Sequence, residues 1–110
     1  MNTIVTSRHF KAHETLVDYA QGSVEKLGHY YDGILKCEVK LSFEKTRNSV
    51  KKAEVIVTVY KSKITALGAS DDFHKSIDGA VKKVLGRLKK YKEKLHSKDR
   101  KQVRRVRAKV

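Results

Sequence analysis

The sequence contains no proline, no tryptophan and a single cysteine among its 110 residues. One cysteine excludes an intrachain disulfide and any metal site built from several thiolates, which suits a reducing compartment. No segment approaches the roughly 20 apolar residues of a membrane-spanning helix. The amino terminus also lacks the basic-then-apolar layout of a secretory signal. We therefore expect a cytoplasmic protein that does not bind a membrane.

Acidic residues are scarce, and most of them lie in the first three quarters of the chain. The 26 lysines and arginines outnumber the 12 aspartates and glutamates, so the formal net charge at pH 7 is +14. Residues 1–81 carry 12 basic and 10 acidic side chains, whereas residues 82–110 carry 14 basic and 2 acidic ones. A nearly neutral body with a strongly cationic end indicates a polyanionic partner.

The spacing of apolar residues predicts two helices and four strands. From about His13 to Tyr31 they recur every three or four positions, which indicates a helix. From Leu35 to Phe43 they alternate with polar residues, which indicates a half-buried strand with Leu35 and Cys37 on its apolar face. Similar patterns place the strands at residues 4–6, 35–44, 53–59 and 64–69, with turns at 45–49 and 61–63.

The last helix is predicted to follow Ser70-Asp71-Asp72, which supplies capping side chains and negative charge. An apolar stripe then continues from Phe73 to Leu95. We expect a folded domain over residues 1–95 and a disordered basic tail over residues 96–110. The order β-α-β-β-β-α predicts an α+β fold, in which a four-stranded, mostly antiparallel sheet carries both helices on one face.

Basic residues fill the side of the last helix that faces away from its apolar stripe. They are Lys75, Lys82, Lys83, Lys89 and Lys90, with Arg87 and Lys94 along one flank. Only Asp78 and Glu93 are acidic between residues 73 and 98, so the helix lacks the alternating i,i+4 acid–base pairs by which an ordinary solvated helix offsets its own repulsion. A solvated surface is the general explanation for a charged helix face. The excess of one sign favours a polyanion-binding face here, because bound phosphates relieve the repulsion and release counterions.

No catalytic pattern is present in the sequence. The histidines form no pair suited to a metal, since His9 and His13 would have to act from a loop beside a helix start. Glycine-rich phosphate loops, GxSxG and paired carboxylates are absent. Cys37 lies on the apolar face of its strand with Leu35 and Val39, which is typical of a small buried side chain. We therefore expect no enzymatic activity, no metal, no cofactor and no small-molecule substrate.

Six short segments follow one another in a characteristic order and spacing. They are IVTSRHF at 4–10, VEKL at 24–27, FEK at 43–45 leading to KAEV at 52–55, DFHKSID at 72–78 and KVLGRLKKYK at 83–92. In this arrangement the chain, to about Leu95, resembles the bacterial ribosome hibernation-promoting factors and ribosome-associated translation inhibitors. That family is also known as the sigma-factor modulation proteins.

The resemblance implies a domain similar to a double-stranded RNA-binding fold. Such a protein would bind the small ribosomal subunit near the decoding centre, block messenger and transfer RNA, and preserve idle ribosomes under stress. We expect it to be a monomer off the ribosome. In the family, basic residues of the final helix contact ribosomal RNA. The positions implied here are Lys83, Lys90 and Lys94, with Lys75, Lys82, Arg87 and Lys89 nearby, together with Arg8 of the opening segment.

The chain departs from the family pattern at two places in the last helix. His74 replaces a common tyrosine, and Gly86-Arg87 replaces arginine–glutamine. The arginine is thereby displaced by one position, about 100° around the helix.

Two other function classes fit the cationic helix. It could be an interaction module for an acidic protein or an anionic membrane, although insertion would require the apolar stripe that the core needs. A general double-stranded RNA binder is the other, but no Lys-Lys-x-Ala-Lys sequence opens the last helix.

Overall fold

The computed structural model describes residues 2–8, 10–44 and 50–108, and for residues 95–108 it describes the backbone alone. The elements are β1 (Asn2–Ser7), α1 (Glu14–Tyr30), β2 (Lys36–Glu44), β3 (Val50–Val59), β4 (Ser62–Ser70) and α2 (Phe73–Ala108). This order confirms the predicted β-α-β-β-β-α arrangement. The turn predicted at 45–49 lies outside the described residues.

The four strands form one mixed sheet in the order β1-β2-β3-β4. β1 pairs with β2 in parallel, and the pairs β2–β3 and β3–β4 are antiparallel. The parallel pair needs a crossover connection, which α1 supplies. One row of opposed residues crosses the whole sheet through Val5, Val39, Val55 and Ala66. The sheet is therefore mostly antiparallel, as the sequence predicts.

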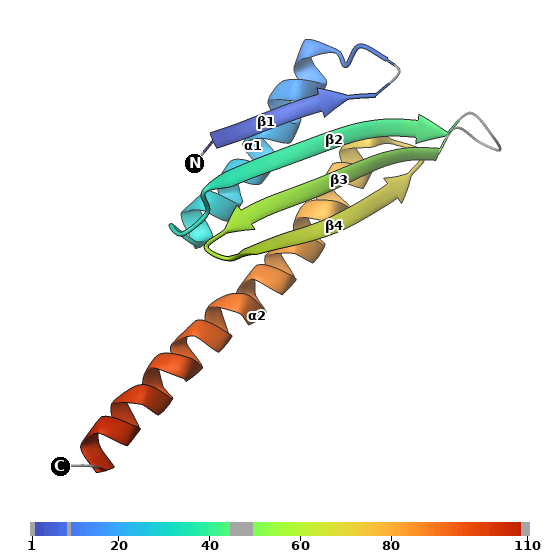
Figure 1. The fold of residues 1–110 in the computed structure, drawn as a ribbon. Coiled ribbons are helices and arrows are strands. Elements are labelled where there is room, and N and C mark those ends of the chain that lie inside the picture. Colours follow the sequence, from blue (N-terminus) through green and yellow to red (C-terminus); the bar gives the residue numbers. More distant parts are fainter. Residues whose placement is uncertain (1, 9, 45–49, 109–110) are drawn as a thin grey trace.

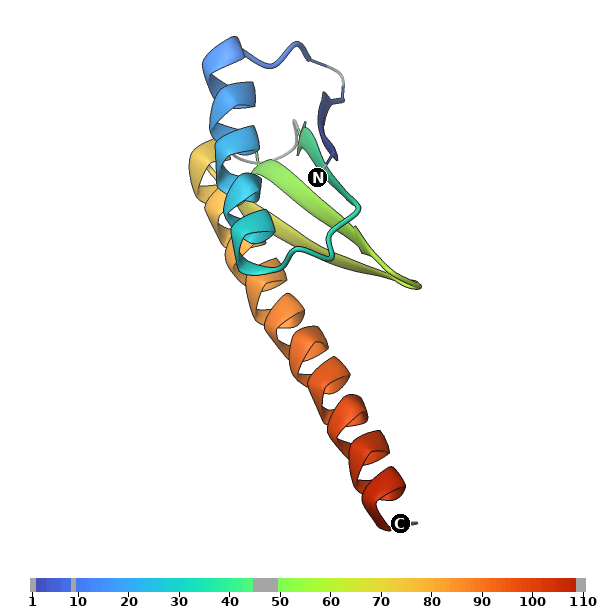
Figure 2. The ribbon, with the colours of Figure 1, turned by 90° about the vertical axis from the view of Figure 1, so that its left-hand side faces the viewer.

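Both helices cover the same face of the sheet. Figure 1 views the sheet with the helices behind it, and Figure 2, turned by 90°, shows the two helices on one side. Alternate strand residues point to this side because the side-chain period of a strand is two. The buried core comprises Leu16, Ala20, Val24, Leu27, Ile34, Cys37, Val39, Leu41, Ala53, Val55, Val57, Val59, Ile64, Ala66, Ile77, Ala80, Val84 and Leu88.

Leu35 is not part of this core, and its predicted position on the buried face of β2 is wrong. It precedes the strand, and 60% of its surface is exposed. Its backbone N–H still donates to the carbonyl of Thr58 at 2.9 Å, so the main chain is anchored while the side chain points to solvent. β2 begins one residue later, at Lys36.

Helix α2 packs closely against β4 at Gly68. A Cβ atom at this glycine would lie 1.9 Å from the carbonyl oxygen of Ser76 and 2.9 Å from the backbone nitrogen of Ala80. Only glycine permits this approach. The position of α2 over the edge of the sheet therefore depends on a residue without a side chain.

Among the residues whose side chains are described, Leu88 is the last buried one of helix α2, which continues past the end of the sheet (Figure 1) and runs to Ala108. It extends beyond residue 95, where the sequence analysis places the end of the folded domain. The division into a domain and a basic tail stays a prediction.

Candidate nucleic-acid interface

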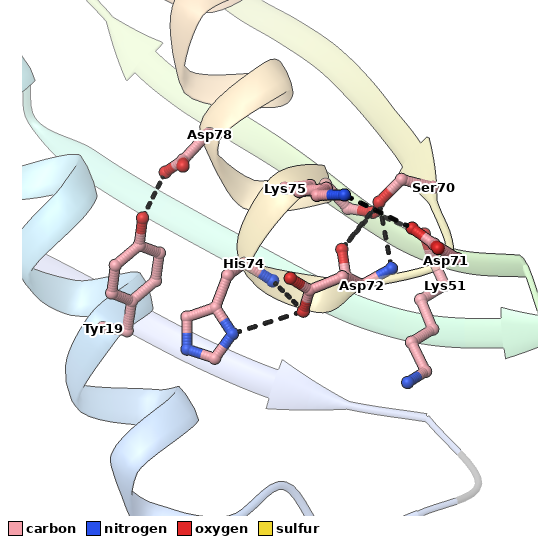
Figure 3. A network of polar contacts seen from close by, with 9 residues as sticks. Tyr19, Lys51, Ser70, Asp71, Asp72, His74, Lys75 and Asp78 are labelled. Carbon is pink, nitrogen blue, oxygen red and sulfur yellow. Dashed lines mark hydrogen bonds and ion pairs between the residues drawn. The ribbon is translucent and has the colours of Figure 1, made fainter.

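The first turn of α2 is fixed by a network of capping contacts, shown in Figure 3. Oδ1 of Asp72 accepts a hydrogen bond from the backbone N–H of His74 at 3.1 Å, as an N-cap residue does. This bond holds the pKa of Asp72 below its ordinary value, because it stabilises the carboxylate. The buried hydroxyl of Ser76 donates to the carbonyl of Lys51 at 2.7 Å, which ties the helix start to β3.

The side of α2 that faces away from the sheet is cationic. The seven basic residues singled out in the sequence are all exposed: Lys75, Lys82, Lys83, Arg87, Lys89, Lys90 and Lys94. The sheet covers the other side of the helix, where Ile77, Val84 and Leu88 are fully buried. The helix thus uses its apolar stripe inside the molecule and presents its charges to solvent.

These cations form two rows. Lys75, Lys82 and Lys89 are spaced by seven residues, so they lie on one line along the outer side of α2, about 10 Å apart. The other four, Lys83, Arg87, Lys90 and Lys94, follow one another at spacings of three or four along the flank toward β4. We call these the outer row and the flank row.

Two members of the flank row contact the edge of the sheet. Nζ of Lys83 donates to the carbonyl oxygen of Leu67 at 2.9 Å, and Nη1 of Arg87 donates to the carbonyl oxygen of Thr65. β4 lies at one edge of the sheet, so these carbonyls have no neighbouring strand on that side. The two cations satisfy them and shield an edge that could otherwise pair with another chain.

Few carboxylates neutralise the helix. Lys75 lies 4.0 Å from Asp71, and both side chains are more than 70% exposed, so this pair contributes little. Among the side chains that the structure describes, no other carboxylate lies within ion-pair distance of the outer or the flank row. Asp78 faces α1, where it accepts a hydrogen bond from the hydroxyl of Tyr19. The positive charge of α2 is therefore open to an external anion.

Arg8 lies apart from the helix. It follows β1, and its backbone N–H donates to the carbonyl of Leu41 at 2.9 Å. Together with Lys40 and Lys52 it lines a hollow on the face of the sheet that no described helix covers. The structure therefore brings together the seven predicted site residues of α2 but not Arg8.

The comparison with protein families agrees with this fold. The family model described as "Sigma 54 modulation protein / S30EA ribosomal protein" matches residues 3–96. The chain belongs to this family. The resemblance to ribosome hibernation-promoting factors that the sequence motifs indicate is thereby confirmed. No curated protein matches the chain.

Solved structures share the fold of this family member. A ribosomal subunit interface protein from Coxiella burnetii is similar with a TM-score of 0.76 and 22% identity, over 84% of this chain and 99% of that one. The N-terminal domain of Protein Y from Thermus thermophilus is similar with a TM-score of 0.72 and 24% identity, over 83% of this chain and 99% of that domain.

The described residues of this family member offer neither a reactive thiol nor a metal-binding group. Burial raises the pKa of the Cys37 thiol to about 11, so at neutral pH it is protonated and unreactive. Within the described ranges, no group of three or more histidine, cysteine or acidic residues could hold a metal ion. None of the described helices is long and apolar enough to cross a membrane.

Sequence reasoning missed two features of the site. Arg8 shares its hollow with Lys40 and Lys52, which were not among the predicted site residues, although their alternation with buried neighbours places them on the open side of the sheet. The bonds of Lys83 and Arg87 to β4 were also missed. Only the crossing of helix and strand reveals them.

Proposed function

We propose that this protein is a ribosome-associated hibernation factor, which binds the RNA of the small ribosomal subunit near the decoding centre and blocks messenger and transfer RNA. The observation that carries the proposal is the cationic side of α2. Its two rows of exposed basic residues form almost no ion pairs with the described carboxylates. Family membership and the likeness to a protein named for the ribosomal subunit interface support it. The protein would act in the cytoplasm as a monomer, without catalysis.

The binding is electrostatic. Lysines and arginines at phosphates position a protein on RNA without reading its sequence, so we expect little base specificity. The sheet holds α2 rigidly through Ile77, Val84 and Leu88, which keeps the outer row aligned before binding. A rigid array loses less conformational entropy on binding than a flexible one.

The two rows differ in availability. Lys82 and Lys89 of the outer row form no ion pair with a described side chain, so they can meet phosphates directly. Lys83 and Arg87 must first leave the carbonyls of Leu67 and Thr65. We therefore expect the outer row, together with Lys90 and Lys94, to supply most of the affinity.

Co-sedimentation with purified ribosomal subunits through sucrose tests the proposal. Contact with roughly five phosphates gives a slope of log affinity against log salt on the order of −4. The triple variant Lys82→Glu, Lys89→Glu, Lys90→Glu should lose binding to the small subunit and inhibition of translation in vitro. Lys26→Glu on α1, exposed and outside both rows, is the control and should keep both.

Three results would contradict the proposal. The triple variant could retain full inhibition, or the affinity for small subunits could be independent of salt. The protein could also bind anionic vesicles or an acidic protein and leave both subunits in the supernatant, which would favour a cationic interaction module.

A further inference from the structure

The face of the sheet that no described helix covers holds a shallow hollow of about 510 Å³. Its lining comes from the end of β1 and from β2, β3 and β4, and it includes the cations Arg8, Lys40 and Lys52. Figure 1 views the sheet from this side, with α2 behind it. We propose that this hollow is a second phosphate-binding site, which takes a phosphate group of an RNA segment lying on the opposite side of the protein from the segment held by α2.

Strand pairing brings the three cations together. Thr6 is opposite Lys40 in the pairing of β1 with β2, and Ser42 is opposite Lys52 in the pairing of β2 with β3. Diagonal neighbours on adjacent strands lie roughly 7–8 Å apart, so Lys40 and Lys52 reach the same hollow. The backbone bond from Arg8 to Leu41 fixes Arg8 beside β2. The cations thus come from three separate segments that the sheet holds in register.

The polar composition of the hollow suits a phosphate. Besides the three cations, Thr6 and Ser42 line it with hydroxyl groups that can donate hydrogen bonds to phosphate oxygens. Leu67, which is 46% exposed, forms an apolar wall, against which a ribose can pack.

Two carboxylates reduce the positive charge. Glu54 also lines the hollow, directly opposite Lys40, and Glu44 pairs with Lys52 at 2.5 Å. The Glu44 side chain is 53% exposed, and such a surface pair contributes no more than about 1 kcal/mol. A phosphate can therefore compete for Lys52. Arg8 and Lys40 form no ion pair among the described side chains, so they remain the principal anion ligands.

This charge balance determines the class of ligand. Three cations against two carboxylates leave too small an excess for tight capture of a free phosphate or nucleotide. A phosphate on a particle already held by α2 arrives at a high effective concentration, however, and then adds affinity. The inference therefore rests on the proposed function and extends it. Folded ribosomal RNA can present backbone on both sides of a bound protein, whereas a single straight duplex reaches only one.

Substitution of Lys40 and Arg8 tests the second site. Lys40→Gln should weaken binding to small subunits and make the salt slope shallower, and Arg8→Gln with Lys40→Gln should remove the whole contribution of the bound phosphate, about 0.9. Lys26→Gln, an exposed lysine of α1, is the matched control and should leave the slope unchanged. Circular dichroism and thermal unfolding verify that each variant is folded. The same measurements on protein-free ribosomal RNA of the small subunit identify the partner of the hollow.

The outcomes separate this inference from the proposed function. If Lys82→Gln weakens binding but Lys40→Gln behaves like Lys26→Gln, the second site is wrong and the helix site stands. If Lys40→Gln weakens binding to intact subunits but not to protein-free RNA, the hollow contacts a ribosomal protein, and the inference is overturned. If the wild-type protein binds no ribosomal subunit, both proposals fail.

Discussion

The hydroxyl of Tyr19 on α1 donates a hydrogen bond of 2.5 Å to Oδ1 of Asp78 on α2. The ring of Tyr19 also lies edge-on to His74, with 4.5 Å between ring centroids. Figure 3 shows the bond between the two helices. It occupies one of the two acidic residues on the described surface of α2, so the Asp78 carboxylate is bound to α1 and forms no ion pair with a described cation of either row.

Removing this hydroxyl should loosen the contact between the helices. Tyr19→Phe keeps the ring and deletes the donor, and we expect a loss of about 1 kcal/mol in the free energy of unfolding at pH 7. Urea unfolding of the wild type and the variant measures it. The control is Tyr60→Phe, at a side chain that is 71% exposed, which should unfold like the wild type.

The effect of Tyr19 should depend on pH. The hydrogen bond to Asp78 raises the pKa of Tyr19 above its ordinary value of 10.0, since an ionised phenol cannot donate. A group whose pKa is raised by folding stabilises the protein fully below its unfolded pKa and loses this contribution as pH rises through the folded pKa. The difference between wild type and Tyr19→Phe should therefore be constant up to about pH 9 and shrink above pH 10. A difference that persists unchanged at higher pH would contradict the assignment.

Asp72 should show the opposite dependence on pH. Because folding lowers its pKa from 3.8, its contribution is present above that value and is lost as pH falls through the lower folded value. Asp72→Ala should unfold at lower urea than the wild type at pH 7, and the gap between the two midpoints should be smaller at pH 3 than at pH 7. Asp71→Ala, at a side chain 81% exposed, is the control and should resemble the wild type at both values.

Gly68 and Gly86 should respond in opposite ways to alanine. At Gly68 a Cβ would lie 1.9 Å from the carbonyl oxygen of Ser76, so Gly68→Ala should destabilise the protein by about 2 kcal/mol. At Gly86 nothing lies within 4 Å, and alanine is the better helix former. Gly86→Ala should therefore stabilise the protein by up to about 1 kcal/mol. Thermal unfolding of both variants measures the sign, and equal shifts would refute the close packing at Gly68.

The main features of the fold could be predicted from the sequence because they depend on periodicity. Alternation identified β2, β3 and β4, and the long apolar stripe identified α2. β1 was predicted over residues 4–6 but spans Asn2–Ser7, because pairing with β2 recruits the flanking residues, beginning with Asn2 opposite Lys36. Such recruitment comes from tertiary structure, which local patterns do not contain.

The site could be predicted only in part. The exposure of the basic residues of α2 follows from the helical period alone. The bonds of Lys83 and Arg87 depend on where α2 crosses β4, and these partners are separated by 16 and 22 residues in the chain. The position of Arg8 on the other side of the sheet depends likewise on strand register. Resemblance to a family points to particular basic residues of the last helix, but it does not indicate which of them already have a hydrogen-bond partner within the protein.

The bonds at the edge of β4 lead to a prediction about self-association. Lys83→Ala with Arg87→Ala would expose the carbonyls of Leu67 and Thr65, and an unprotected edge strand can pair with another chain. Analytical ultracentrifugation should show more dimers or larger species for this variant than for Lys82→Ala with Lys89→Ala, which removes the same charge without uncovering the edge. Identical sedimentation of the two variants would show that the two cations do not protect the edge.

The same bonds predict a ranking of neighbouring lysines in ribosome binding. Lys82 and Lys83 are adjacent and both exposed, but only Lys83 donates to a carbonyl of the protein. A phosphate contact of Lys83 replaces an existing hydrogen bond, whereas one of Lys82 replaces water alone. Lys82→Gln should therefore make the salt slope for small subunits shallower by about 0.9, and Lys83→Gln by less. Lys83→Gln should instead lower the thermal stability, which Lys82→Gln should leave unchanged. If Lys83→Gln weakened binding more than Lys82→Gln at equal stability, the flank row and not the outer row would be the principal contact with RNA.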